Sequence, residues 1–161
     1  MDLVGQIRED SRRRLRSAAE ARFLEAESLA ESGYGLASVY LHGYSVEIVL
    51  GLAFFSREGY GEDREIGEIE RRAALYRARQ ESADPREAHP IDGWAALLVK
   101  HSRSRYHGPF AAALTEKTSV IWRHWRPVLR YKTPTVSGTQ LAEVRTASGW
   151  VRSNLVQIER G

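Results

Sequence analysis

Apolar residues recur along most of the chain at the three-to-four-residue spacing of an α-helix. The strongest such pattern covers residues 36–57, where apolar or aromatic side chains lie on almost every side of the expected helix. A helix of this kind belongs at the centre of a bundle rather than on its surface. No segment alternates polar and apolar positions long enough to predict a strand. We therefore expect an all-α fold.

Glycine, proline and capping residues delimit the other expected helices. These helices cover residues 6–31, 62–80, 91–102 and 108–126, and a final helix starts at residue 137. Ser137 and Gln140 have the spacing of a capping box, as do Asp84 and Glu87, where the following Pro90 leaves room only for a short turn. The connections are short. We expect one domain over residues 1–161, an up-and-down helical bundle of four main helices plus one or two short helices.

The helix expected at residues 62–80 carries an apolar stripe and a densely charged opposite face. The stripe consists of Ile66, Ile69, Ala73 and Tyr76. A charged face is usually solvated, so we expect the stripe to face the core.

Glu47 is the exception within the apolar helix. It lies on the stripe that contains Tyr40, Gly43 and Leu50, so its carboxylate should point into packed surroundings. An unpaired carboxylate there is costly. We expect Glu47 to have a partner that organises the core, with Arg22, Arg130 and Tyr131 as candidates.

The composition is that of an ordinary globular protein, with 42% hydrophobic and 28% charged residues and a formal net charge of +3. The absence of cysteine excludes disulfides, thiol catalysis and cysteine-type zinc sites. Without a run of about eighteen apolar residues, we expect no membrane span. Charges near the N-terminus, from Arg8 to Arg16, argue against a signal peptide. We expect a cytoplasmic location.

The five histidines form no recognisable metal motif. They are His42, His89, His101, His107 and His124. None belongs to a His-Glu-x-x-His or Glu-x-x-His arrangement, and no glycine-rich phosphate loop is present. We expect no metal and no cofactor, and we expect most of these histidines to be surface or cap residues.

A basic, aromatic region covers residues 100–132, where Glu116 is the single acid. One interpretation is a phosphate-binding and base-stacking surface. Its candidate contacts are Arg103, Arg105, Arg123, Arg126, Arg130 and Tyr131. The other interpretation, the commoner outcome for charge runs, places Phe110, Trp122 and Trp125 in the core and pairs the arginines with the acidic third helix.

The apolar helix resembles the second helix of HEPN-type domains (higher eukaryotes and prokaryotes nucleotide-binding). The matching residues are Ala37, Tyr40, Leu41, His42, Gly43, Tyr44, Val46, Glu47 and Leu50. The preceding helix, with Phe23 and Leu24, and the segment Trp125, Leu129, Arg130 and Tyr131 are also similar to that family.

The resemblance implies a helical bundle that commonly forms homodimers. Family members pair with a minimal nucleotidyltransferase or act as RNases in toxin–antitoxin and antiviral systems. The RNase members carry an Arg-x(4–6)-His motif, and no histidine of this chain completes it. Gly51 also stands where the family often has lysine.

Three functional hypotheses follow. The first is a non-catalytic HEPN-like module that binds RNA, a nucleotide or a nucleotidyltransferase partner, with Glu47 organising the core. The second is a degenerate, metal-independent RNase that uses His107 with Arg103 or Arg105. The third is a structural homodimer module whose aromatic surface is the interface.

Overall fold

The computed structural model describes residues 10–102 and 106–161. Within these ranges the elements, in chain order, are α1 (Arg12–Glu31), α2 (Gly35–Arg57), α3 (Glu68–Glu81), α4 (Ile91–Lys100), α5 (Gly108–His124), the 3₁₀ helix η2 (Pro127–Tyr131), α6 (Gly138–Ser153) and α7 (Leu155–Arg160). The described part of the chain holds no β-sheet, and the one bridge in it joins Asp10 to Ile66. The prediction of an all-α helical bundle is confirmed.

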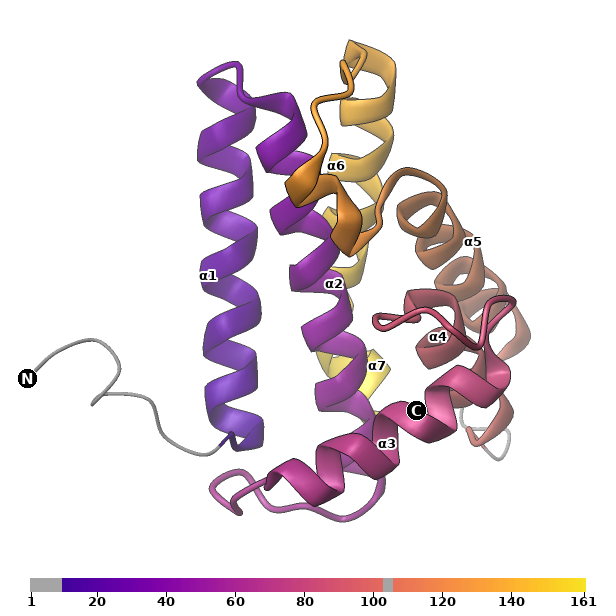
Figure 1. Ribbon diagram of the computed structural model, residues 1–161. Coiled ribbons are helices and arrows are strands. Elements are labelled where there is room, and N and C mark those ends of the chain that lie inside the picture. The colour runs from indigo at the N-terminus through magenta and orange to yellow at the C-terminus, as the bar shows by residue number, and fades with distance from the viewer. Residues whose placement is uncertain (1–9, 103–105) are drawn as a thin grey trace, which may run out of the picture.

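Helix α2 is the centre of the bundle. It runs antiparallel to α1, and α4, α6 and α7 pack on its remaining sides (Figure 1). By length and composition α2 is apolar enough to cross a membrane. This finding differs from our expectation that the chain has no such segment. The apolar surface of α2 is instead largely covered by the other helices, an arrangement compatible with a soluble protein.

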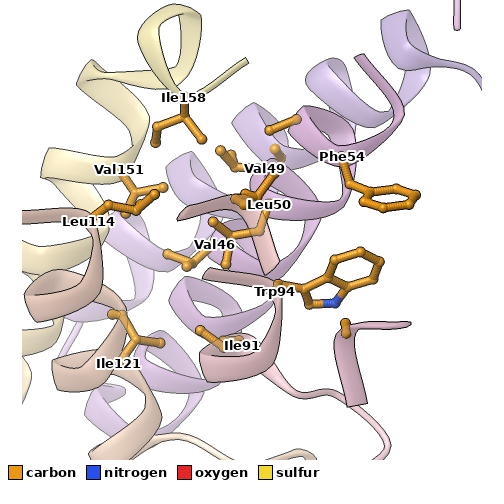
Figure 2. Close-up of a cluster of buried hydrophobic side chains, with 14 of the residues drawn as sticks. Val46, Val49, Leu50, Phe54, Ile91, Trp94, Leu114, Ile121, Val151 and Ile158 are labelled. Carbon is orange, nitrogen blue, oxygen red and sulfur yellow. The ribbon is translucent and has the colours of Figure 1, made fainter. Parts of the chain in front are cut away.

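One hydrophobic core joins the helices (Figure 2). Val46 and Leu50 of α2 meet side chains from four other helices in this cluster. These partners are Ile91 and Trp94 of α4, Leu114 and Ile121 of α5, Val151 of α6 and Ile158 of α7. Because early and late parts of the chain share this cluster, α2 can only be buried once the C-terminal helices have packed on it.

The helix boundaries follow their caps. Ser11 caps α1, whose predicted first residues 6–9 lie outside the described ranges. Ser137 and Gln140 form the predicted capping box of α6. The single final helix that we expected is divided at Asn154, whose side-chain amide donates to the Trp150 carbonyl at 2.8 Å.

The predicted inward stripe of residues 62–80 is confirmed for Ile66, which precedes α3 and is fully buried, and is wrong for Ile69, Ala73 and Tyr76. Ile69 and Tyr76 are 83% and 64% exposed, and the buried face of the helix consists of Ala74 and Ala78. Helix α3 lies across one end of the bundle and packs on α4 (Figure 1). At that crossing a Cβ on Gly93 would lie 2.1 Å from the Ala78 carbonyl oxygen, so the two backbones touch. Such close approach requires small residues, and it turns the larger ones outward.

A second close approach joins α2 to the end of α5. The Trp125 indole is fully buried against Gly43, and its Nε1 donates to the Tyr40 carbonyl at 2.9 Å. A Cβ on Gly43 would lie 2.2 Å from the indole ring. Glycine is therefore required at position 43 for packing. The buried Trp125 ring fixes the end of α5 against α2, and η2 begins two residues later at Pro127.

Replacing Gly43 by alanine should lower the free energy of unfolding by about 1–3 kcal/mol, the usual cost of overpacking, because the Trp125 indole must move away from the new Cβ. Urea unfolding measures this free energy. Gly51→Ala in the same helix is the matched control: a Cβ there meets nothing within 4 Å, so it should stabilise the helix by about 0.5–1 kcal/mol. Equal effects of the two substitutions would contradict the role given to Trp125.

Candidate functional site

The carboxylate of Glu47 is paired with a histidine. His89, in the turn between α3 and α4, brings its Nδ1 to 2.8 Å and 3.0 Å from the two carboxylate oxygens. The Glu47 side chain is 14% exposed and that of His89 34%. The expected partner Arg22 is elsewhere, bonded to Glu25 on α1. Glu47 is thus neither sealed in the core nor open to solvent, because His89 covers it.

Burial and pairing set the protonation of this couple. Burial raises the pKa of Glu47, although the hydrogen bond from His89 opposes that change. The same hydrogen bond raises the pKa of His89 above its ordinary value. When Glu47 is ionised, its carboxylate only accepts hydrogen bonds, so Nδ1 of His89 carries the proton that lies between the two groups. The other ring nitrogen, Nε2, is then the atom through which His89 can exchange a proton.

Aromatic side chains surround the pair. The Tyr44 ring meets His89 edge-on at 5.6 Å and Trp125 at 5.3 Å between ring centroids. Tyr40, one turn earlier on α2, approaches Tyr44 with its hydroxyl at 3.4 Å from the Tyr44 hydroxyl. Burial raises the pKa of Tyr44, so this phenol stays protonated. The site therefore has a low-polarity wall with two hydroxyl groups at its edge.

Two predicted arginines lie beside this wall, in different states. Arg130 of η2 is exposed, and its interactions with Tyr131 and with the Tyr40 hydroxyl raise its pKa. Arg126 is half-buried: its guanidinium stacks on Trp122 and donates to the Trp122 and Trp125 carbonyls. Arg126 thus holds the α5–η2 corner together, whereas Arg130 keeps donors turned to solvent.

The other predicted phosphate contacts are spread along the chain. Arg123 and Tyr131 are exposed, on α5 and η2. Arg103 and Arg105 lie outside the described residues. His107 is the N-cap of α5, where its Nδ1 accepts from the Phe110 amide at 3.3 Å.

A small pocket of about 210 Å³ opens next to Arg123. Leu36 and Val39 of α2 and Leu129 of η2 give it an apolar lining, and Arg123 and Gln140 are among its polar residues. The 3₁₀ helix η2 therefore adjoins the aromatic wall through Arg130 and this pocket through Leu129.

A second polar cluster, missed by sequence reasoning, lies in the core. His42 is fully buried, so the expectation of a surface histidine is wrong for this residue. Its Nδ1 is 2.9 Å from the Ser148 hydroxyl, and its Nε2 is 3.1 Å from the Glu27 carboxylate but without hydrogen-bond geometry. Burial lowers the pKa of His42 to about 4. The order serine, histidine, carboxylate resembles a hydrolase triad, but Ser148 is itself buried and no substrate can reach it.

No group of three or more histidine, aspartate or glutamate side chains in residues 10–102 and 106–161 is arranged to hold a metal ion. Comparison with protein families, with curated proteins and with solved structures finds no match to this chain. The HEPN resemblance therefore stays a prediction, as do the homodimer and the nucleotidyltransferase partner that it implies.

Proposed function

We propose that this protein is a HEPN-like binding module for a phosphate-bearing ligand, RNA or a nucleotide. The observation that carries the proposal is a set of exposed cations that the fold leaves uncompensated. Arg123, Arg130 and Lys132 have no carboxylate partner among the described residues, and the exposed ring of Tyr131 lies between the last two in sequence. We call these four residues the cationic edge.

Several arginines elsewhere in the protein are instead neutralised by carboxylates of the same chain. Arg13, Arg145 and Arg152 each donate two hydrogen bonds to one carboxylate. Of the basic region, Lys100 does pair with the acidic third helix, through Glu81. Cations that pair with carboxylates of the same chain form a solvated surface whose charge is neutralised. Cations without such a partner attract external anions. The cationic edge is thus the part of the basic region best suited to a ligand.

The chemistry of the cationic edge fits a single-stranded or mononucleotide ligand. Its cations can neutralise phosphates, and the exposed Tyr131 ring offers a face for base stacking. The adjoining pocket has room for a flat apolar group between α2 and η2. Its lining includes Arg123, so a phosphate and a base of one nucleotide can be bound side by side.

Replacing Arg123, Arg130 and Lys132 together by glutamine should weaken the binding of a short single-stranded RNA and reduce its salt dependence. Each phosphate contact on a single strand contributes about 0.7 to the slope of log affinity against log salt, so the slope should fall by about 2. Fluorescence anisotropy at several salt concentrations measures both quantities.

Arg64→Gln is the matched control for this experiment. Arg64 is an exposed arginine that lies over the Tyr60 ring, in the α2–α3 loop, so its loss should change neither affinity nor slope. No RNA or nucleotide binding by the wild-type protein, or equal losses in the control and the triple variant, would refute the proposal.

The Glu47–His89 pair favours a second candidate, metal-independent RNA cleavage. A carboxylate that orients an imidazole through Nδ1 leaves Nε2 able to take a proton. His89 would accept the proton of a ribose 2′-hydroxyl as its oxygen attacks phosphorus, and would return it to the departing 5′-oxygen. Arg130, whose charge acts on His89, would stabilise the phosphorane. In this candidate mechanism the general base is His89 rather than His107.

If the protein cleaves RNA in the presence of a chelator, His89→Asn should reduce the rate by about 100-fold or more, as expected for loss of a general base. A fluorogenic oligoribonucleotide measures the rate. His107→Asn should leave it unchanged, because asparagine also serves as an N-cap. Cleavage that requires His107 and not His89 would contradict the assignment and favour the pair of His107 with Arg103 or Arg105.

A further inference from the structure

The pocket of about 210 Å³ beside Arg123 lies where α2, α5, η2 and α6 meet. Aliphatic side chains line it from three directions along the chain: Leu36 and Val39 of α2, Leu129 of η2, and Val136 just before α6. Apolar surfaces of this kind hold the faces of a planar ring, and a few polar groups then fix which ring is accepted. The polar lining of this pocket therefore decides what it selects.

Gln140 offers hydrogen-bond donors to this pocket. Its side chain forms the capping box of α6, in which Oε1 accepts from the Ser137 amide at 2.9 Å. Because a backbone N–H requires an acceptor, that bond fixes which end of the side-chain amide lies at the helix end. The Nε2 group is left with both of its N–H donors, for which the described residues supply no acceptor.

His124 adds an acceptor to the lining. Its Nε2 lies 2.7 Å from Oε2 of Glu143. When Glu143 is ionised its carboxylate only accepts, so Nε2 carries the proton and Nδ1 of the neutral ring is an acceptor. No aspartate or glutamate is among the described residues that line the pocket. The polar lining is thus dominated by the donors of Gln140 and Arg123, with one imidazole acceptor.

This set of groups matches bases that carry a carbonyl oxygen next to a ring N–H. Uracil and guanine have that edge, and we call them the keto bases. Cytosine and adenine carry an amino group in place of the carbonyl, which would bring donors against the donors of Gln140. A glutamine recognises adenine when it donates and accepts at once, but Oε1 of Gln140 is already bound to Ser137.

We propose that this pocket selects keto bases and that Gln140 is its specificity-determining residue, an assignment that rests on the proposed binding of RNA or a nucleotide. Arg123 contacts the phosphate, Gln140 donates to the carbonyl oxygen of the base, and His124 accepts from the neighbouring ring N–H. An amino base in the same position leaves the Gln140 donors without an acceptor and removed from water, which weakens its binding.

Fluorescence anisotropy with four RNA hexamers tests the assignment. Each hexamer consists of cytidine except at the third position, which is cytidine, uridine, guanosine or adenosine. The uridine and guanosine hexamers should bind at least about fivefold more tightly than the other two, the ratio that one net hydrogen bond provides.

Gln140→Glu should abolish this preference. Glutamate keeps the capping box, because its carboxylate also accepts from the Ser137 amide, but at neutral pH it has no donor for a carbonyl oxygen. The added charge repels all four hexamers alike, so the ratio of their affinities is the quantity to compare. Thr139→Glu is the matched control: it adds the same charge one residue earlier, at an exposed position outside the pocket lining, and should keep the preference.

Four results would overturn the keto-base assignment while leaving RNA binding by the cationic edge intact. They are equal binding of the four hexamers by the wild type, a preference for only one of the two keto bases, an undiminished preference in Gln140→Glu, and a loss of preference in Thr139→Glu. Binding of none of the hexamers would overturn the assignment as well and, unlike the other results, would count against the proposed function itself.

Discussion

The burial of α2 depends on the neutralisation of Glu47. This helix supplies the centre of the core, yet it carries a carboxylate among apolar side chains. Leaving such a group buried without a partner would cost several kcal/mol, a cost of the order of the whole stability of a domain (roughly 5–15 kcal/mol). His89 removes that cost by donating to the carboxylate at 2.8 Å. The turn between α3 and α4 is therefore held on α2 by a polar contact, while α4 itself docks through Ile91 and Trp94.

The same face of α2 connects the pair to the cationic edge. Gly43, one turn before Glu47, admits the Trp125 indole, and the Tyr40 carbonyl accepts its hydrogen bond. The chain continues from Trp125 into η2, which presents Arg130 to the Tyr40 hydroxyl. One face of α2 thus positions three groups from distant parts of the chain. Gly43 contacts the Trp125 ring, the Tyr40 hydroxyl contacts Arg130, and Glu47 binds the His89 imidazole. A ligand bound at η2 would contact a surface whose shape depends on α2.

The sequence predicts the parts of this account that depend on local periodicity and caps. The all-α fold, the central position of α2 and the capping box at Ser137 follow from residue spacing alone. The partner of Glu47 does not, because His89 lies in an irregular turn 42 residues later, where no periodicity indicates which way a side chain points. The orientation of α3 could not be predicted from the sequence either. Its alanines pack against α4 because only small side chains fit there, and hydrophobicity alone had favoured Ile69 and Tyr76 for the core.

The most direct test of the central claim is an NMR titration of the His89 imidazole in the wild-type protein and in Glu47→Gln. If Glu47 holds the His89 proton, the pKa of His89 should exceed its ordinary value of 6.5 in the wild type. In the variant the hydrogen-bonding charge is gone, and burial together with the charge of Arg130 outweighs the smaller opposing effect of Glu87, so the pKa should fall below that value. An unchanged His89 pKa would contradict the account.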